Sequence, residues 1–343
     1  MDRRRSPAAA RAWLGAVLLA VAAGATAQDR GPSLPEVRLS TAQGPAFALG
    51  RAGARWAQLV NERAPRTFEV KTYPGAVLAG RDAAREFGAL RDGTAEMAVG
   101  SALAWSAQLP VFAVYVLPWL APEARAQEAL AADAALLAHV AASAARSGVV
   151  VVAVAPAGER VLATVREAVQ APADVAGLAV RVIPNQLVIE TLAALGARPE
   201  SLDFGAAQAA FAAGRLGGQE ATPSTLAATR AATSGQKFVT RWGAFADQMV
   251  FAVRAATWEA WSDEERAFVR AAALEAAREA AAPAREDAAL AELTRQGITI
   301  VKPAPAQRAA FRAAVQPVWA KWTAVVGADA ARAAEAAVAA AAK

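Results

Sequence analysis

One permanent cation interrupts an apolar run near the middle of the chain. Residues 178–183 read Leu-Ala-Val-Arg-Val-Ile between Gly177 and Pro184, which predicts a strand buried on both faces of a parallel sheet. Arg181 cannot lose its proton, and an unpaired guanidinium is costly in an apolar layer. It therefore either pairs with a carboxylate of the protein or faces a cleft in which a ligand supplies the carboxylate. Clefts of open α/β sheets lie at the carboxyl ends of strands, where Arg181 falls.

Few other residues suggest catalysis or metal binding. The chain has no cysteine and a single histidine, His139, which we expect on the surface of an alanine-rich helix from Ala124 to Arg146. A zinc site or a Ser-His-Asp triad is therefore not expected, because each needs several such ligands or a positioned base. No nucleotide, calcium or hydrolase motif occurs, so we expect no cofactor. A periplasmic enzyme using Asp82, Glu220 or Asp247 as acid and base is an alternative, although no spacing pairs these carboxylates.

The segments around Arg181 predict the elements that position it. Asn185 is expected to cap a helix with apolar residues at helical spacing, and Gly196 to end it. A second short helix is expected from Gly205 to Ala213. Another strand is expected to end near Gly217-Gly218-Gln219-Glu220.

Alternating strands and helices run through the rest of the chain. Strands are predicted at 36–41 and 68–73 with a helix between them, which indicates a right-handed βαβ unit and a parallel sheet. Further strands are predicted at the ranges 95–100, 149–154, 237–242, 248–254 and 297–301. Ser262 and Glu265 form a capping box for a helix from Asp263 to about Ala281, long enough at ~1.5 Å per residue to lie along two lobes. With 343 residues, 56% of them hydrophobic, the chain predicts a two-lobed α/β fold.

The first 27 residues predict a secretory signal. Arginines near the start precede a short apolar core and the small residues Ala25-Thr26-Ala27, so cleavage is expected near Ala27 and the protein in the periplasm. Removing this segment takes four basic residues and one acidic residue from the totals of 36 and 31, which lowers the formal charge from +5 to about +2. We therefore expect no nucleic-acid partner.

Several ordered motifs resemble one family. The segment 172–182 reads PADVAGLAVRV, and it is followed by a helix ending in LGA and by GGQE at 217–220. This resembles the signature of the periplasmic solute-binding subunits of tripartite ATP-independent (TRAP) transporters, the DctP family, whose patterns are P-x-D-L-x-G-L-K-x-R-V and V-D-G-Q-E-N-P. Similar matches at residues 78–97, 117–120 and 242–247 extend the resemblance over residues 36–327.

The resemblance implies a type II-like periplasmic-binding-protein fold with a hinge. Lobe I would comprise residues 28–157 and 247–280, and lobe II residues 158–246 and 281–343, with the long helix spanning both. Such a monomeric protein would capture an organic acid between its lobes and deliver it to the TRAP membrane permease subunits, which an ion gradient drives. A ligand-binding partner of an extracytoplasmic sensor would have the same pocket and is an alternative.

The resemblance also implies where the ligand binds. Arg181 would make the main contact with the carboxylate and Arg160, twelve residues before Pro172, a supporting one, although Glu159 could neutralise Arg160. Phe204 would stack on the ligand or pack within its lobe. Ser101 and Trp105 would face the cleft, or else serve as a helix cap and a packed ring. The implied ligand-binding residues are Arg181, Arg160, Phe204, Ser101, Trp105, Ala221, Thr222 and Trp242.

The chain departs from the family pattern at one binding position. Where the family carries an asparagine after Gln-Glu, this chain has Ala221, followed by Thr222 and Pro223. The hydroxyl of Thr222 is a candidate replacement for the missing amide. This departure leaves the predicted fold unchanged, but it puts the dicarboxylate or sialic acid preference of the family in doubt.

Overall fold

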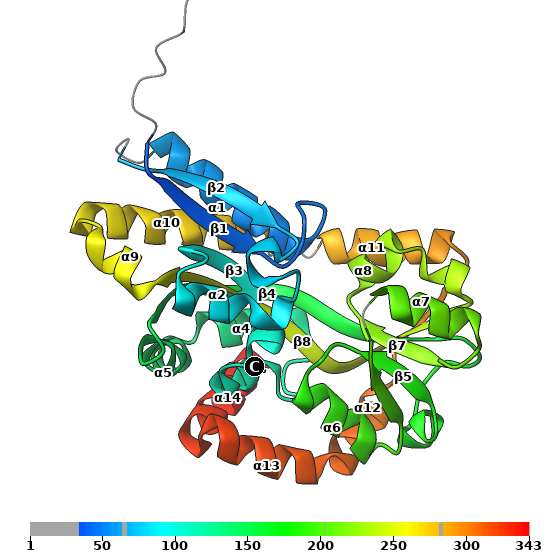
Figure 1. Ribbon diagram of the computed structural model, residues 1–343. Helices are drawn as coiled ribbons and strands as arrows, with labels where there is room; N and C mark the ends of the chain where they lie inside the picture. Colours follow the sequence, from blue (N-terminus) through cyan, green and yellow to red (C-terminus); the bar gives the residue numbers. More distant parts are fainter. Residues whose placement is uncertain (1–33, 64–66, 203, 281–283, 343) are drawn as a thin grey trace, which may run out of the picture. The chain divides into compact units, whose positions relative to one another are not determined.

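The computed structural model describes residues 34–63, 67–202, 204–280 and 284–342. Within them, one nine-stranded sheet has the order β2-β1-β3-β8-β4-β7-β5-β6, with β9 paired to β8 (Figure 1). The predicted signal segment 1–27 lies outside the described residues. The sheet and the helices on its faces confirm the mixed α/β fold.

The first half of the sheet is the predicted βαβ unit. β1 (Glu36–Thr41) pairs in parallel with β2 (Glu69–Pro74) and β3 (Met97–Ser101), and α1 (Ala48–Arg63) connects β1 to β2. The helix buries the apolar residues that the spacing predicts, among them Leu49, Trp56, Leu59 and Val60. Asp82 caps the 3₁₀ turn η2 (Ala83–Arg85), which leads into α2 (Glu86–Asp92). Another 3₁₀ turn, η1, covers Val77–Ala79.

Two long strands run through both halves of the sheet, which corrects three predicted strands. β4 (Val149–Thr164) continues ten residues beyond the predicted end, and β8 (Phe238–Arg254) joins the two strands predicted at 237–242 and 248–254. Residues 245–247 of the linker that we expected between them stay in the antiparallel ladder, with Phe245 opposite Arg160 and Asp247 opposite Gly158. The β4–β8 ladder contains three register shifts, where extra residues of one strand are left unpaired, as in β-bulges.

The second half of the sheet carries the predicted central strand. β5 (Ala179–Val182) pairs in parallel with β6 (Arg198–Ser201) and β7 (Gly218–Ala221), which confirms that the run around Arg181 lies inside a parallel sheet. Asn185 caps α6 (Gln186–Ala194) as expected. The remaining elements of this half are η4 (Pro172–Val175), α7 (Phe204–Ala212), α8 (Pro223–Ala228) and η5 (Ala231–Ser234).

The predicted helix from Ala124 to Arg146 is two helices. α4 (Ala124–Ala132) and α5 (Ala134–Ala145) meet at Asp133, whose backbone is extended and whose carboxylate accepts a hydrogen bond from Leu136 N at 2.7 Å. His139 is exposed on α5, as expected. No single described helix is long and apolar enough to cross a membrane, and only the α4–α5 pair, bent by 61°, reaches that length and composition. The segments α3 (Ala102–Trp105) and η3 (Pro110–Val116) precede this pair.

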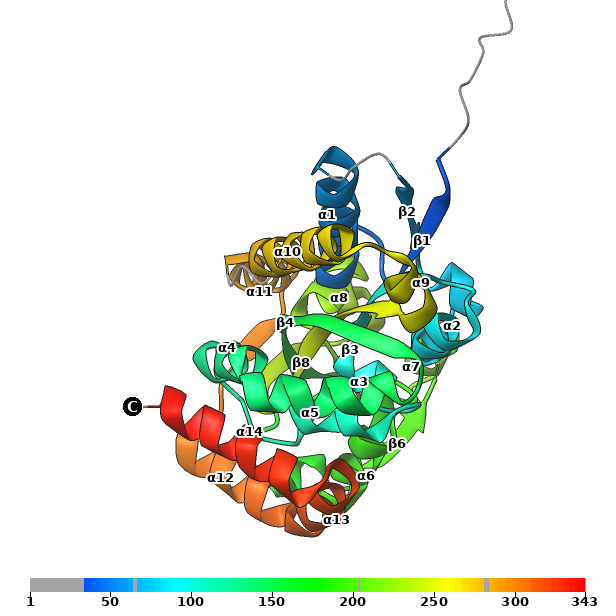
Figure 2. The same ribbon diagram turned by 90° about the vertical axis from the view of Figure 1, so that its left-hand side faces the viewer.

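We expected one long helix to lie along both lobes, but two separate helices lie there instead. α10 (Asp263–Ala280) follows α9 (Ala255–Ala260), begins at the predicted capping box, and packs on α1 and β4. α11 (Ala284–Arg295) packs instead on α8 and β9 (Thr299–Val301). Figure 2 shows α14 (Ala328–Ala341) beside α5, with α12 (Pro305–Ala314) and α13 (Gln316–Val326) next to it. Residues 34–343 pack as one compact unit, so the lobe boundaries stay a prediction.

Candidate functional site

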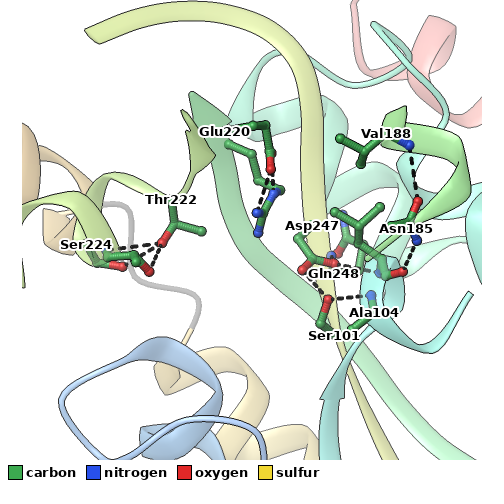
Figure 3. A network of polar contacts seen from close by, with 12 residues as sticks. Ser101, Ala104, Asn185, Val188, Glu220, Thr222, Ser224, Asp247 and Gln248 are labelled. Carbon is green, nitrogen blue, oxygen red and sulfur yellow. Dashed lines mark hydrogen bonds and ion pairs between the residues drawn. The ribbon is translucent and has the colours of Figure 1, made fainter. Parts of the chain in front are cut away.

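A buried ion pair lies beside the point where β4 passes from one half of the sheet to the other. Arg160 of β4 donates from Nη2 to Oε2 of Glu220, on the neighbouring strand β7, at 2.8 Å, and also from Nε to Oε1. The two residues are 8% and 0% exposed (Figure 3, where Glu220 is labelled). Nη1 of Arg160 makes no hydrogen bond to any residue that the structure describes. The bidentate contact therefore fixes the guanidinium and leaves one of its nitrogens for another acceptor.

The carboxylate next to Arg160 in sequence has a different partner. Glu159 pairs with Arg241 of β8, so the pairing that we left open for Glu159 and Arg160 does not form. Arg160 is paired with Glu220, which lies sixty residues away in the sequence.

A second buried carboxylate, Asp247, joins β8 to the start of α3. Its oxygens accept hydrogen bonds from the Ser101 hydroxyl, from Leu103 N at 3.1 Å and from Gln248 N at 2.9 Å (Figure 3). Burial raises the pKa of Asp247, while the positive charge of Arg160 and the hydrogen bond from Ser101 oppose that shift. Ser101 also caps α3, since its Oγ accepts from Ala104 N at 3.0 Å. The helix-cap alternative for Ser101 is therefore present in the structure, and the same hydroxyl donates to Asp247.

Asn185 connects the two halves of the molecule. Its Oδ1 accepts from Val188 N at 3.2 Å as the cap of α6, and its Nδ2 donates to Leu103 O at 2.6 Å and to Ser106 Oγ at 2.9 Å (Figure 3). The sequence predicted the cap but not the contact with the α3 region, because nothing in the local pattern shows which distant backbone a side-chain amide will reach.

Arg181 lies on β5, on the other side of β7 from Arg160. Its side chain is half-buried, and Nε donates to Leu202 O at 2.9 Å. Its backbone lies opposite Gln219 of β7, while Ala221 of β7 lies opposite Val161 of β4. The two arginines thus come from the two strands that flank β7, near its carboxyl end, where Ala221 and Thr222 follow Glu220.

The residues at the end of β7 are small or already hydrogen-bonded. Ala221 is buried, and Thr222 caps α8 by accepting from Thr225 N at 3.2 Å. The Thr222 hydroxyl also lies 3.1 Å from Ser224 Oγ (Figure 3). Thr222 and Ser224 line a cavity of about 80 Å³ together with Arg51 of α1 and residues 156–159 of β4. The hydroxyl proposed to replace the family's amide therefore reaches open space where α1, β4 and α8 approach one another.

Both candidate tryptophans are fully buried. Trp105 packs against Phe87 and Phe112, with ring centroids 5.5 and 5.6 Å away. Trp242 packs against Trp119 at 5.5 Å and Phe311 at 6.1 Å. Neither ring contacts solvent, so for Trp105 the packing alternative describes the structure. Phe204 begins α7, but its side chain lies outside the described part of the chain.

Sequence reasoning missed one buried carboxyl group. Glu86 of α2 is 0% exposed and accepts a hydrogen bond from the Ser40 hydroxyl at 2.7 Å. Burial raises the pKa of Glu86 to about 7. A glutamate at the start of a short helix is usually solvated, so no local signal indicates this burial. Among the described residues, no group of three or more His, Cys, Asp or Glu could hold a metal ion.

This fold and site define a class of protein. Two halves of one mixed sheet, joined by two long strands and with a buried arginine beside the joint, are typical of two-lobed solute-binding proteins. The chain belongs to the bacterial extracellular solute-binding protein family 7, DctP, whose family model matches residues 39–324.

Solved structures agree with this assignment. A TRAP periplasmic solute-binding protein from Ralstonia eutropha H16, solved with bound (S)-2-acetolactate, is 36% identical, with a TM-score of 0.82 over 89% of this chain and 98% of that chain. A TRAP protein from Ochrobactrum anthropi, with a C-terminus bound in its ligand-binding pocket, has 23% identity, a TM-score of 0.82 and coverages of 89% and 95%. One from Shewanella oneidensis with bound succinate has 21% identity, a TM-score of 0.79 and coverages of 89% and 99%. The last two support the fold alone, and the comparison with curated proteins gives no match.

Proposed function

We propose that this chain is a periplasmic receptor that binds a small organic anion at Arg181 and Arg160 and delivers it to a TRAP membrane permease. The observation that carries the proposal is the buried Arg160–Glu220 pair, which fixes a guanidinium and leaves its Nη1 without a hydrogen bond from the described residues. Arg181, on the far side of β7, supplies the second cation. A guanidinium suits a carboxylate, which accepts two parallel N–H bonds.

The size and polarity of the ligand follow from the residues around these arginines. Ala221 has no polar side chain, and Thr222 offers one hydroxyl, so we expect fewer hydrogen bonds to the ligand body than an asparagine would allow. The relative from Ralstonia eutropha was solved with (S)-2-acetolactate, a branched 2-hydroxy-3-oxo acid with a single carboxylate. Short hydroxy and oxo acids of this kind are therefore the first ligands to test.

Replacing Arg181 tests the main contact. Arg181→Ala should weaken binding of (S)-2-acetolactate, or of the best ligand in a panel of short carboxylates, by about 2 to 5 kcal/mol, because the anion loses its charged partner. Isothermal titration calorimetry measures the change. Arg146→Ala, which removes an exposed arginine at the end of α5, is the matched control and should bind as the unaltered protein does.

The controls separate loss of binding from loss of fold. Circular dichroism and the melting temperature should show that Arg181→Ala is folded. If the folded variant keeps the unaltered affinity, Arg181 does not contact the ligand. If no short carboxylate binds even the unaltered protein, the proposed ligand class is wrong.

Delivery to a permease requires a separate measurement. Vesicles that contain the membrane subunits of a TRAP permease should take up the ligand only when the receptor is added and an ion gradient is imposed. A receptor that serves a sensor would bind the ligand equally well but would not support this uptake.

A further inference from the structure

A second cavity lies in the second half of the molecule, at the opposite end of β7 from Glu220 and Ala221. Its volume is about 460 Å³, within the range of small-molecule sites. It is lined where β4 ends and where β5 and β7 begin: Val165 N donates to Gly217 O at 3.0 Å, and Gly217 N donates to Ala179 O at 2.9 Å. It shares no lining residue with the anion site proposed above, and we call it the basic cavity.

Three arginines from separate segments line the basic cavity. Arg166 follows β4, Arg198 begins β6, and Arg215 lies between α7 and β7. All three are exposed, and none forms an ion pair with the described residues. Arg198 Nε donates a hydrogen bond to Gly177 O at 3.2 Å. Their guanidiniums are therefore available to an anion, and arginine is the side chain best suited to hold a planar one.

The floor of the basic cavity is apolar. Phe211 and Leu216 are 7% and 4% exposed and belong, with Ala179, Ala207 and Ala210, to a small hydrophobic cluster separate from the main core. Leu178 and Val169 complete the apolar lining. A ligand that used both the floor and the arginines would need an apolar body as well as a negative charge.

The charge balance limits the ligand to one negative charge. Two carboxylates, Glu167 and Asp174, also line the basic cavity, so its formal charge is +3 − 2 = +1. Asp174 already accepts backbone N–H bonds from Gln170 and Ala171, each at 2.8 Å. A small inorganic dianion or a tricarboxylate would exceed the available positive charge and would leave the floor uncovered.

We propose that the basic cavity is a second binding site, independent of the interlobe site, for an organic monoanion with an aromatic or branched apolar body. The arginines at its mouth bind the acidic group, and Phe211 and Leu216 contact the apolar body.

A fluorescent probe of this chemistry tests the proposal. 8-Anilinonaphthalene-1-sulfonate has one negative charge and two aromatic groups, and its fluorescence rises in an apolar site. We expect saturable binding to the folded protein with one probe per chain, unchanged by a saturating interlobe ligand and unchanged in Arg181→Ala. The double variant Arg198→Gln with Arg215→Gln should weaken binding at least tenfold. The uncharged analogue N-phenyl-1-naphthylamine should bind the unaltered protein and the double variant equally.

A charge-matched control completes the experiment. Arg91→Gln with Arg146→Gln removes two exposed arginines from other parts of the surface and should bind the probe as the unaltered protein does. The proposal is overturned if the probe does not saturate, if both double variants lose the same affinity, if the cavity variant loses none, or if the interlobe ligand displaces the probe.

Discussion

At the scale of single residues, burial decides which charged groups carry function. Arg160 and Glu220 are buried together and neutralise each other, so the ion pair survives away from water. Asp247 is stabilised differently, by one hydroxyl and two backbone N–H groups. Glu86 has the Ser40 hydroxyl beside it and forms no ion pair within the described chain, and burial raises its pKa.

The stability of the protein should therefore depend on the protonation of Glu86. Its pKa in the folded protein, about 7, lies above the ordinary value of 4.5, so the folded state holds this proton more tightly than the unfolded chain does. The resulting stability is complete below pH 4.5 and is lost as the pH rises toward 7, by at most about 1.4 kcal/mol per pH unit. Urea unfolding at pH 5 and pH 7 measures the loss.

A neutral isostere isolates this group from other titrating residues. Glu86→Gln keeps an acceptor for the Ser40 hydroxyl but cannot ionise. We expect it to unfold at nearly the same urea concentration at both pH values, or at least to lose less stability than the unaltered protein. Equal losses in the two proteins would show that Glu86 does not titrate in this range.

At the scale of elements, close packing fixes the short helix that carries Trp105. A Cβ added to Gly100, at the end of β3, would lie 2.0 Å from Cε2 of the fully buried Trp105 ring. Only a glycine lets α3 fold back against its own strand at this distance. The packing of Trp105 against Phe87 and Phe112 therefore depends on Gly100, which has no side chain.

Adding a methyl group at Gly100 should destabilise the protein. Gly100→Ala forces a fully packed ring to move, which typically costs about 1 to 3 kcal/mol, or more where the backbone must shift. Gly44→Ala is the control, because no atom lies within 4 Å of its added Cβ, and its effect should stay within about 0.5 kcal/mol. Thermal unfolding of the two variants measures the difference, and equal melting temperatures would contradict this account of α3.

At the scale of the whole molecule, β4 and β8 are the sheet strands shared by both halves. The register shifts in β4 at residues 156–158 and 160–162 lie between the parts that pair with each half. Backbone irregularity of this kind lets two rigid parts bend against each other. Asn185 bridges the halves on the side of α3, so bending at β4 and β8 would be coupled to breaking its hydrogen bonds.

Ligand binding should therefore compact the protein. Small-angle scattering with saturating ligand should give a smaller radius of gyration than scattering without it, because two-lobed receptors close around a bound ligand. Arg181→Ala at the same ligand concentration should keep the larger value. Superimposable profiles from the unaltered protein with and without a ligand of proven affinity would rule out closure.

The sequence by itself determined most of the local structure. Apolar spacing, glycine and proline boundaries and capping residues predicted the bounds of β1, β5, α6 and α10 closely and the buried face of α1, because each depends on interactions within a few positions. The ordered motifs around Arg181 also indicated the family. The sequence failed at β4 and β8, where residues 245–247 of the predicted linker stay paired with β4.

Only the tertiary structure decided which charges meet. Arg160 pairs with Glu220 and Glu159 with Arg241, and the buried Glu86 reaches Ser40 forty-six residues away. Trp105 and Trp242 are fully buried and pack against other aromatic rings, and for Trp105 the sequence had left this packing open. The physical reason is the same in each case: pairing and burial depend on which strands become neighbours in the sheet, and that order is set by the packing of the whole chain rather than by any local pattern.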